Sequence, residues 1–546
     1  MTRTASVALA WLAGGAFALV LTLAYIDRYG TLNQATYLLD PLRRAMPELY
    51  RHDWFVSGTP PYLPTFGWVT AWLFRIDPDG PMAVLAAHVV VTMATYAAIC
   101  AVIRAVSSDP RVCAIVPAVS ALTLGRTLGG NYLLAGYLQP ASIATLGWVI
   151  AMAALVRGRF LVCGIALALA GWMHVNYLVL GIGLFTLVAL WRRGVRLGEL
   201  VRLLAPQLVV LAWFLPDLLS AAGPSAQAVR ILVEFHAPGH YAAGRLAAHL
   251  PELALWQLAA WAALPLLDAR GELRMLWRFS QIVLAICAAT TLIVWIPALS
   301  SLTQVRWSRI APFGQLACQV IVVAALLGAA AAQATGAPGL SAVRRLAIAA
   351  ATVLAVLATC RFLHVSPAPT IVLAASVLAV SGAALWQVRF ARSVATAFTA
   401  GIVAATLWAS PRGEGLTTQT AGSPGERALA SWAQRETAPD AVFLTPPSMS
   451  RFRLLARRAI VVDTKSPPLR PDALVQWYRR LCAVVQVSDA PTHEWVEARW
   501  DQLTPGQRET VARSFGADYI VVGAGVAMPG TPVYANDEYA VYRTSG

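Results

Sequence analysis

The sequence predicts a polytopic α-helical membrane protein that ends in a soluble α/β domain. Only 13% of the 546 residues are charged, about half the share found in a typical soluble protein. Long apolar runs recur between Trp11 and Ala409, separated by short basic stretches, and the charge density becomes ordinary after Ser410. We therefore divide the chain into a transmembrane domain, residues 1–410, and a C-terminal α/β domain, residues 411–546.

The net charge of +15 follows from the same organisation. Most arginines lie between apolar runs, where the positive-inside rule expects them. The C-terminal part has no basic stripe with interleaved aromatics, so no nucleic-acid partner is expected. Of the seven cysteines only Cys482 follows Ser410, which excludes a disulfide framework and a cysteine-built metal site. No metal ligands and no cofactor are identified, and a divalent metal ion stays an open alternative.

About 20 helical residues cross the hydrocarbon core, and this length predicts about 13 transmembrane helices. The first, residues 6–26, has no clear cleavage site, so we expect an uncleaved helix and not a signal peptide. The run from Phe160 to Trp191 is too long for one crossing and has arginines on both sides, which predicts two short spans turning near residues 171–176. The other expected spans are residues 81–103, 112–128, 137–156, 199–221, 253–267, 279–300, 309–333, 343–363, 368–387 and 392–409.

This count puts every arginine-rich connection on one side, which the positive-inside rule makes cytoplasmic. The N-terminus is then cytoplasmic, and the C-terminal domain is periplasmic or extracellular at a bacterial inner membrane. The outer face then collects the long loop 27–80, the turn at His174, the loop 223–252 and the segment 304–309. Such a gathering of polar groups marks a functional site in a membrane protein. In the first loop, the short apolar stretch Leu63–Phe74 predicts a re-entrant or interfacial helix.

The C-terminal segment alternates strands with helices, which predicts a small domain with a largely parallel sheet. Helices are expected at residues 426–435, 449–457, 471–484 and about 504–515, and strands at 441–445, 460–463, 519–522, 533–534 and 540–542. Strands expected at residues 441–445 and 460–463 end at Pro446 and Asp463, and ligands bind at such carboxyl ends in open α/β sheets. Lys465 follows the second strand and is the only lysine beside 41 arginines. Asp463 and Lys465 are therefore candidate binding residues. A GC-rich genome that has left one lysine by chance is the alternative explanation.

Four local stretches, all on the expected outer side, carry a resemblance to a known family. They are Leu32-Asn33-Gln34 through Arg51-His52-Asp53-Trp54-Phe55, Gly171-Trp172-Met173-His174, Phe235-His236-Ala237-Pro238-Gly239-His240-Tyr241, and Arg458 through Val462-Asp463-Thr464-Lys465-Ser466-Pro467. Their content and order resemble an uncharacterised bacterial multi-pass membrane protein family allied to the GT-C superfamily of glycosyltransferases, which use polyprenyl-phosphate sugars. The sequence departs from the family pattern at two points. Asp27 is followed by Arg28, where the superfamily often has paired acidic residues. His236 and His240 are more widely spaced than the histidine pair expected in the family.

The resemblance implies transfer of a sugar from a lipid-phosphate donor at the external face, in cell-envelope glycan assembly. The implied partners are membrane lipid and a lipid-linked sugar donor. A carboxylate is a suitable base for the acceptor hydroxyl. Asp53, in its His-Asp-Trp-Phe context, is the first candidate, and Asp27 and Asp40 follow. The structural alternatives are a helix cap for Asp53, the end of the first span for Asp27 and a helix start for Asp40.

The donor phosphate needs cationic or hydrogen-bonding groups. Arg306 and Arg309 begin a span on the outer side, against the positive-inside trend, and guanidinium binds phosphate bidentately. His174 interrupts an apolar run, where a polar side chain usually faces a cavity or a partner. Interfacial arginines and ordinary loop or core histidines are the alternatives. The candidate substrate-binding residues are Asn33, Gln34, His174, His236, His240, Tyr241, Arg306, Arg309, Asp463 and Lys465.

A transporter or flippase of a lipid-linked precursor is the second function that fits the sequence, and a non-catalytic envelope-assembly subunit is a third. A transporter predicts charges along a path within the spans, together with inverted repeats and broken helices. The charges instead crowd at the outer face, and the sequence shows no internal repeat. This distribution favours the enzyme.

Overall fold

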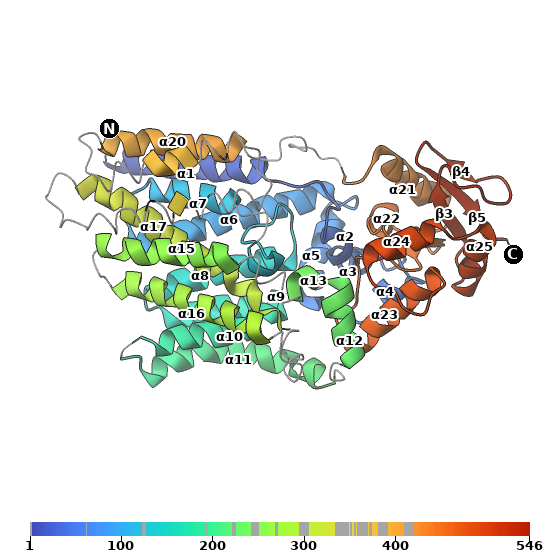
Figure 1. The fold of residues 1–546 in the computed structure, drawn as a ribbon, viewed down its shortest axis with the longest axis horizontal. Helices are drawn as coiled ribbons and strands as arrows, with labels where there is room; N and C mark the ends of the chain where they lie inside the picture. The colour runs from blue at the N-terminus through green and yellow to red at the C-terminus, as the bar shows by residue number, and fades with distance from the viewer. Residues whose placement is uncertain are drawn as a thin grey trace.

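The computed structural model consists of a helical bundle at one end and a C-terminal domain with a small sheet at the other (Figure 1). It describes residues 3–61, 63–122, 127–192, 194–220, 225–241, 250–267, 271–293, 305–332, 391–408 and 420–545, with short pieces between 349 and 379. The expected spans 343–363 and 368–387 lie almost entirely outside these residues. The described residues therefore cover most of the other expected spans and the C-terminal segment.

Apolar helices in the described part of the chain lie side by side and form the bundle (Figure 1). Four of the described helices are long and apolar enough to cross a membrane. The polytopic helical membrane class predicted from composition is therefore observed. The helices of the bundle are α1 (Arg3–Ala24), α6 (Pro81–Val106), α7 (Val112–Leu122), α8 (Pro140–Val156), α9 (Phe160–Met173), α10 (Val175–Leu190), α11 (Leu197–Ser220), α15 (Leu250–Ala263), α16 (Gly271–Ile293), α17 (Ala311–Ala332) and α20 (Ala391–Trp408).

Helix α17 runs through the middle of the bundle, and α11 lies at its edge. In the apolar stretch that includes α17, 94% of the residues are buried, whereas only 11% are buried in the corresponding stretch of α11. Val209 and Trp213 of α11 are more than two thirds exposed, at 72% and 71%. An exposed apolar surface of this kind is expected where a helix faces lipid tails in place of water.

Helices α9 and α10 form the expected pair of short spans. His174 separates them with extended backbone angles, and α10 then runs back along α9. A Cβ atom at Gly171 would lie 2.6 Å from the Leu178 Cβ, and one at Gly181 would lie 3.3 Å from Leu167 Cδ2. These two contacts join positions on either side of His174, so the helices are antiparallel and in contact. The predicted hairpin is confirmed, and His174 lies at its tip.

Gly164 allows α9 to approach α11 closely, and this gives a first testable prediction. An added Cβ would lie 2.5 Å and 2.7 Å from the carbonyl oxygens of Leu203 and Arg202, which are backbone atoms that cannot rotate away. Gly164→Ala is therefore expected to destabilise the protein by roughly 1–3 kcal/mol, a typical penalty for overpacking. Thermal unfolding in detergent measures the effect. The matched control is Gly183→Ala in α10, where no atom lies within 4 Å; equal melting temperatures for both variants would contradict the close helix contact.

The first loop folds into four short helices against the bundle. These are α2 (Gln34–Tyr37), α3 (Leu39–Ala45), α4 (Trp54–Gly58) and α5 (Pro64–Ile76). Helix α5 buries Phe66 and Phe74 and exposes Trp68, Trp72 and Ile76, which are spaced four residues apart on one face. An amphipathic helix with exposed tryptophans has the form of an interfacial helix, the second of the two structures expected for Leu63–Phe74.

The C-terminal domain contains a five-stranded sheet with the order β2-β1-β3-β5-β4. Strands β2, β1 and β3 are parallel, and β5 runs antiparallel to β3 and β4. The sequence predicted these elements except α24, whose two buried side chains, Val496 and Trp500, are too few to produce a periodic pattern. The elements are α21 (Pro424–Glu436), β1 (Val442–Leu444), α22 (Phe452–Ala456), β2 (Ala459–Ile460), α23 (Pro471–Val484), α24 (His493–Asp501), α25 (Pro505–Ser514), β3 (Tyr519–Gly523), β4 (Tyr534–Ala535) and β5 (Tyr539–Arg543).

The C-terminal domain packs against the first loop and against the segment of residues 225–241. The buried Tyr50 hydroxyl of the first loop donates a hydrogen bond of 2.8 Å to the Arg453 carbonyl of α22. On the other side, the Phe235 ring contacts the rings of Trp477 and Tyr478 in α23. Most of the candidate substrate-binding residues lie around the space between these two contacts.

Candidate functional site

A cavity of about 320 Å³ lies between the end of the helix bundle, the first loop and the C-terminal domain. Segments far apart in the sequence contribute to its wall. Its polar lining residues are Asn33, Thr36 and Tyr37 of the first loop, Asn131, Tyr132 and Gln139 before α8, His174, Asn176 and Tyr177 of the α9–α10 turn, His236, His240 and Tyr241, Arg306 and Arg309, and Lys465 of the C-terminal domain.

The cavity brings together most of the residues that the sequence suggested for substrate binding. Gln34 and Asp463 do not line it, nor do the three candidate bases. No aspartate or glutamate occurs among the described lining residues, so the site is cationic as well as polar. The residues that do line it are Asn33, His174, His236, His240, Tyr241, Arg306, Arg309 and Lys465.

Arg306 and Arg309 dominate the charge at the bundle side of the cavity. Arg306 precedes η6 (Trp307–Ile310), a single 3-10 turn that leads into α17, and Arg309 lies within this turn. Arg306 has a left-handed backbone (φ 48°), a strained conformation for a residue that is not glycine. The Arg309 guanidinium contacts His174 Nε2 and lies over the Tyr177 ring, 5.5 Å from its centroid.

Within the described part of the chain, Arg306 and Arg309 lack the carboxylate counterions that guanidinium groups usually have. Among the described residues no carboxylate forms an ion pair with either, and both Nε atoms are buried without a hydrogen-bond partner. Burial and the neighbouring Arg309 charge lower the pKa of Arg306 below its usual value. Buried donors of this kind are costly unless a ligand satisfies them. The geometry therefore suits an anion with several acceptor oxygens, such as a phosphate.

His240 is held in place by a glycine turn. The turn η2 (Leu128–Gly130) contains two glycines with positive φ angles, 68° at Gly129 and 66° at Gly130. The Gly129 carbonyl lies 2.5 Å from His240 Nδ1 and accepts its proton, which leaves Nε2 as a hydrogen-bond acceptor. Burial and the Arg306 charge lower the pKa of His240 to about 2. This histidine is therefore neutral at pH 7, and the positive charge of the site comes from the arginines and Lys465.

His236 also lines the cavity, at the end of the π-helical turn η3 (Ile231–His236). Burial, His493, Lys465 and Arg306 together lower its pKa to about 3. Its Nδ1 atom is buried without a hydrogen-bond partner. His236 therefore resembles His240 as a neutral polar group that faces a cationic cavity.

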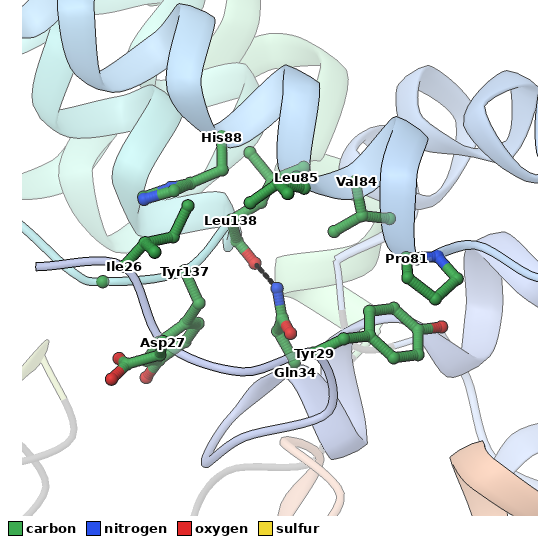
Figure 2. Close-up of a pocket in the computed structure, with 11 residues that line it drawn as sticks. Ile26, Asp27, Tyr29, Gln34, Pro81, Val84, Leu85, His88, Tyr137 and Leu138 are labelled. Atoms are coloured by element: carbon green, nitrogen blue, oxygen red, sulfur yellow. Dashed lines mark hydrogen bonds between the residues drawn. The ribbon is translucent and has the colours of Figure 1, made fainter. Parts of the chain in front are cut away.

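Asp27 and Gln34 line a second, smaller cavity beside α1 and α6, together with His88 and Tyr137 (Figure 2). Gln34 fixes the chain after α1, because it accepts a hydrogen bond from Gly30 N (2.9 Å) and donates to the Leu138 carbonyl (3.5 Å). The Asp27 carboxylate points away from Gln34, beside Tyr137 (Figure 2).

Tyr137 provides a hydrogen-bonded link between the two cavities. Its hydroxyl lies 2.8 Å from the Tyr132 hydroxyl, and Tyr132 lines the large cavity. Of the three candidate bases, Asp27 is therefore the one that the described hydrogen bonds and neighbours connect to the cationic site.

Asp40 and Asp53 both lie in ion pairs away from the large cavity. Asp40, in α3, pairs with Arg44 at 2.8 Å and with Arg43 at 3.7 Å. Asp53 caps α4, because its Oδ1 accepts a hydrogen bond of 2.9 Å from Val56 N. The Oδ2 atom of Asp53 binds Arg453 Nε at 2.7 Å, and its side chain is fully buried. The contacts of Asp53 are thus those of a helix cap and an ion pair, and the helix cap is the structural alternative that was named for this residue.

Several lining residues were not predicted. Tyr37, Asn131, Tyr132 and Asn176 occupy the wall beside the arginines. Asn131 and Tyr132 fall in the short polar break between two expected spans on the outer side, and this position was a usable signal. Asn176 is next to the predicted turn, and its side-chain amide donates to the Val305 carbonyl, which ties the hairpin tip to the arginine segment.

Comparisons with known proteins match the chain to a family and to solved structures. A family described as a domain of unknown function (DUF6798) matches residues 424–484, within the C-terminal domain. The solved structure of ArnT from Cupriavidus metallidurans bound to undecaprenyl phosphate matches 99% of this chain and 98% of that chain, with 14% identity and a TM-score of 0.44. No curated protein sequence matches the chain.

Proposed function

We propose that this protein transfers a sugar from a polyprenyl-phosphate donor, and that the donor phosphate binds Arg306 and Arg309 in the large cavity. The observation that carries the proposal is the pair of half-buried arginines without a counterion among the described residues. Guanidinium groups bind phosphate oxygens bidentately. Apart from Lys465, the other polar lining residues carry neutral hydroxyl, amide and imidazole groups, which suit the hydroxyls of a sugar.

The position of the cavity supports a donor that is anchored in the membrane. It opens where α17 begins, at the end of the bundle that carries the first loop and its exposed tryptophan face on α5. Tryptophans of this kind favour the headgroup level of a bilayer. A lipid phosphate at this level places its sugar toward the C-terminal domain.

We place this end of the bundle on the periplasmic side. The supporting argument is the distribution of arginines at the opposite end. Consecutive helices are antiparallel, so the connections α6–α7, α8–α9 and α10–α11 lie at the end away from His174 (Figure 1). Arg104, Arg157, Arg159 and Arg192 occur at that end, which the positive-inside rule assigns to the cytoplasm.

A transporter or flippase of a lipid-linked precursor is the second candidate. One observation favours it, namely that no carboxylate occurs among the described residues that line the cavity. A protein that only binds and moves an anionic lipid needs no general base. The two candidates differ in the role of Asp27, which only the enzyme needs as a base.

Phosphate binding is tested with the purified full-length protein in nanodiscs and undecaprenyl phosphate as the probe. Arg306→Ala and Arg309→Ala are each expected to weaken binding about 10- to 100-fold, the range for losing a hydrogen bond between charged groups. Arg104→Ala, which removes an exposed arginine at the other end of the bundle, is the control and should bind as the wild type does. Unchanged affinity in both cavity variants would overturn the proposal.

A further inference from the structure

His240 lines the large cavity and has one ring nitrogen in use and one open. The Gly129 carbonyl can only accept a hydrogen bond, so its contact with Nδ1 places the proton of the neutral ring on Nδ1. No described residue bonds the other nitrogen, Nε2, and this atom is not among the buried atoms without a partner. Nε2 is therefore an acceptor that a ligand in the cavity can reach.

The other two histidines of the cavity differ from His240 in this respect. The Nε2 atom of His174 already contacts the Arg309 guanidinium, which can only donate, and its Nδ1 atom is buried. The Nδ1 atom of His236 is buried as well, and no described hydrogen bond fixes which of its nitrogens carries the proton. Among the described cavity histidines, His240 therefore combines a fixed proton with an open acceptor.

The glycine turn that binds His240 also contacts the arginine segment, residues 306–309. A Cβ atom on Gly129 would lie 2.2 Å from Ser308 Oγ, so the backbone of the turn packs directly on this segment. The Asn131 amide, at the end of the turn, donates a hydrogen bond of 3.1 Å to the same hydroxyl. Gly129 thus contacts His240 through its carbonyl and the arginine segment through its Cα, which places the ring beside the proposed phosphate site.

The arginines and His240 select different groups of a ligand. Guanidinium groups only donate hydrogen bonds, whereas an imidazole nitrogen without a proton only accepts them. A phosphate oxygen therefore binds the arginines and is repelled by the lone pair of Nε2, to which a hydroxyl group can donate. Because burial and the Arg306 charge lower the pKa of His240 to about 2, the ring stays neutral and is too weak a base to remove the hydroxyl proton at pH 7.

We propose that His240 Nε2 binds a substrate hydroxyl beside the phosphate held by Arg306 and Arg309, and so orients the sugar end of the substrate in the cavity. The inference rests on the proposed function for the phosphate. The hydroxyl comes from one of two sources, the sugar of the lipid donor or the acceptor that receives this sugar. Gly129 and Gly130 are positioning residues in this arrangement, because their turn fixes the proton and the place of the His240 ring.

Two substitutions separate the two nitrogens of His240. The side-chain amide of asparagine reaches the position of Nδ1, so His240→Asn keeps the hydrogen bond to Gly129 and removes the acceptor in the cavity. The longer side chain of glutamine reaches the position of Nε2, so His240→Gln keeps an acceptor there and loses the bond to Gly129. A structural role of His240 favours the asparagine variant, whereas binding of a hydroxyl favours the glutamine variant.

Binding to the full-length protein in nanodiscs is measured for undecaprenyl phosphate and for the same lipid carrying glucose, arabinose or N-acetylglucosamine. If the hydroxyl belongs to the donor sugar, the wild type binds at least one glycosylated lipid about tenfold more tightly than undecaprenyl phosphate. His240→Asn should lose this gain, and His240→Gln should keep most of it. If the hydroxyl belongs to the acceptor, both variants bind every probe as the wild type does, but only His240→Gln restores surface glycans to a strain that lacks the protein.

The same measurements separate this inference from the proposed function. Arg306→Ala should weaken undecaprenyl phosphate itself, and its failure to do so overturns the phosphate site. The role of His240 is overturned if His240→Asn matches the wild type in binding and in glycan restoration, if both His240 variants lose the same function equally, or if His240→Asn weakens undecaprenyl phosphate as Arg306→Ala does. The matched control is His52→Asn, because the Nδ1 atom of this exposed histidine lies 3.3 Å from the Asp440 carbonyl, outside the cavity; it should change neither measurement.

The positioning role of the turn is tested by combining Gly130→Ala with His240→Asn. Gly130 has a φ of 66°, and an added Cβ would lie 3.0 Å from His240 Cε1 and 3.2 Å from Nδ1, so alanine displaces the ring. Gly130→Ala alone should reproduce the loss seen in His240→Asn and should add nothing to it in the double variant. Losses that sum would contradict the positioning role. Gly194→Ala, with a φ of 78° and no atom within 4 Å, is the control for backbone strain.

Discussion

Arg453→Ala is expected to destabilise the folded protein by about 3–5 kcal/mol, the range for removing one partner of a buried ion pair. The variant leaves the carboxylates of Asp53 and Asp463 buried without the guanidinium that both of them contact. It also removes a cation that lies over the Phe55 ring, 5.3 Å from its centroid. Because the network joins the first loop to the C-terminal domain, we expect the contact between these two parts to weaken first.

Thermal unfolding in detergent, followed by tryptophan fluorescence, measures this loss. Limited proteolysis tests which contact opens, because cleavage near residues 465–471 should appear before the bundle unfolds. The matched control is Arg470→Ala, which removes an exposed ion pair of the kind that contributes about 0–1 kcal/mol. Similar melting temperatures for the two variants would show that the buried network carries no more stability than an exposed pair.

Asp27→Asn is expected to lower the rate of sugar transfer by about two to four orders of magnitude, the usual contribution of a general base. Asp40 and Asp53 form ion pairs with arginines outside the large cavity. Asp27 instead lies beside Tyr137, whose hydroxyl contacts the cavity residue Tyr132 (Figure 2). The affinity for undecaprenyl phosphate should stay within about twofold of the wild type, because the arginines that bind the phosphate are unchanged.

The activity is measured as the lipid-linked sugars and surface glycans that each variant restores to a deletion strain. Asp40→Asn is the control, since it removes a carboxylate of the same loop that lies in an i,i+4 ion pair. Restoration by Asp27→Asn at the wild-type level would remove Asp27 as the base. If Asp53→Asn also restored the glycans, no candidate carboxylate of the first loop would remain, and the transporter function would replace the enzyme.

The sequence by itself determined the features that depend on local composition. Apolar runs predicted the bundle, because a helix that faces lipid must be apolar along its whole length. The arginines around Phe160–Trp191 and the length of that run predicted a hairpin, and the structure places its turn at His174. Alternating patterns predicted most strands and helices of the C-terminal domain, including α23 with both of its ends.

Only the tertiary structure decided what the polar residues contact. Asp53 looked like a catalytic base in its His-Asp-Trp-Phe context, but its partner Arg453 is 400 residues away in the sequence. Asp463 and Lys465 looked alike as residues after a strand, yet one is buried in the ion-pair network and the other lines the cavity. The physical reason is that a charge is placed by its counterion and by its burial, and both depend on contacts between segments that the chain brings together only when it folds.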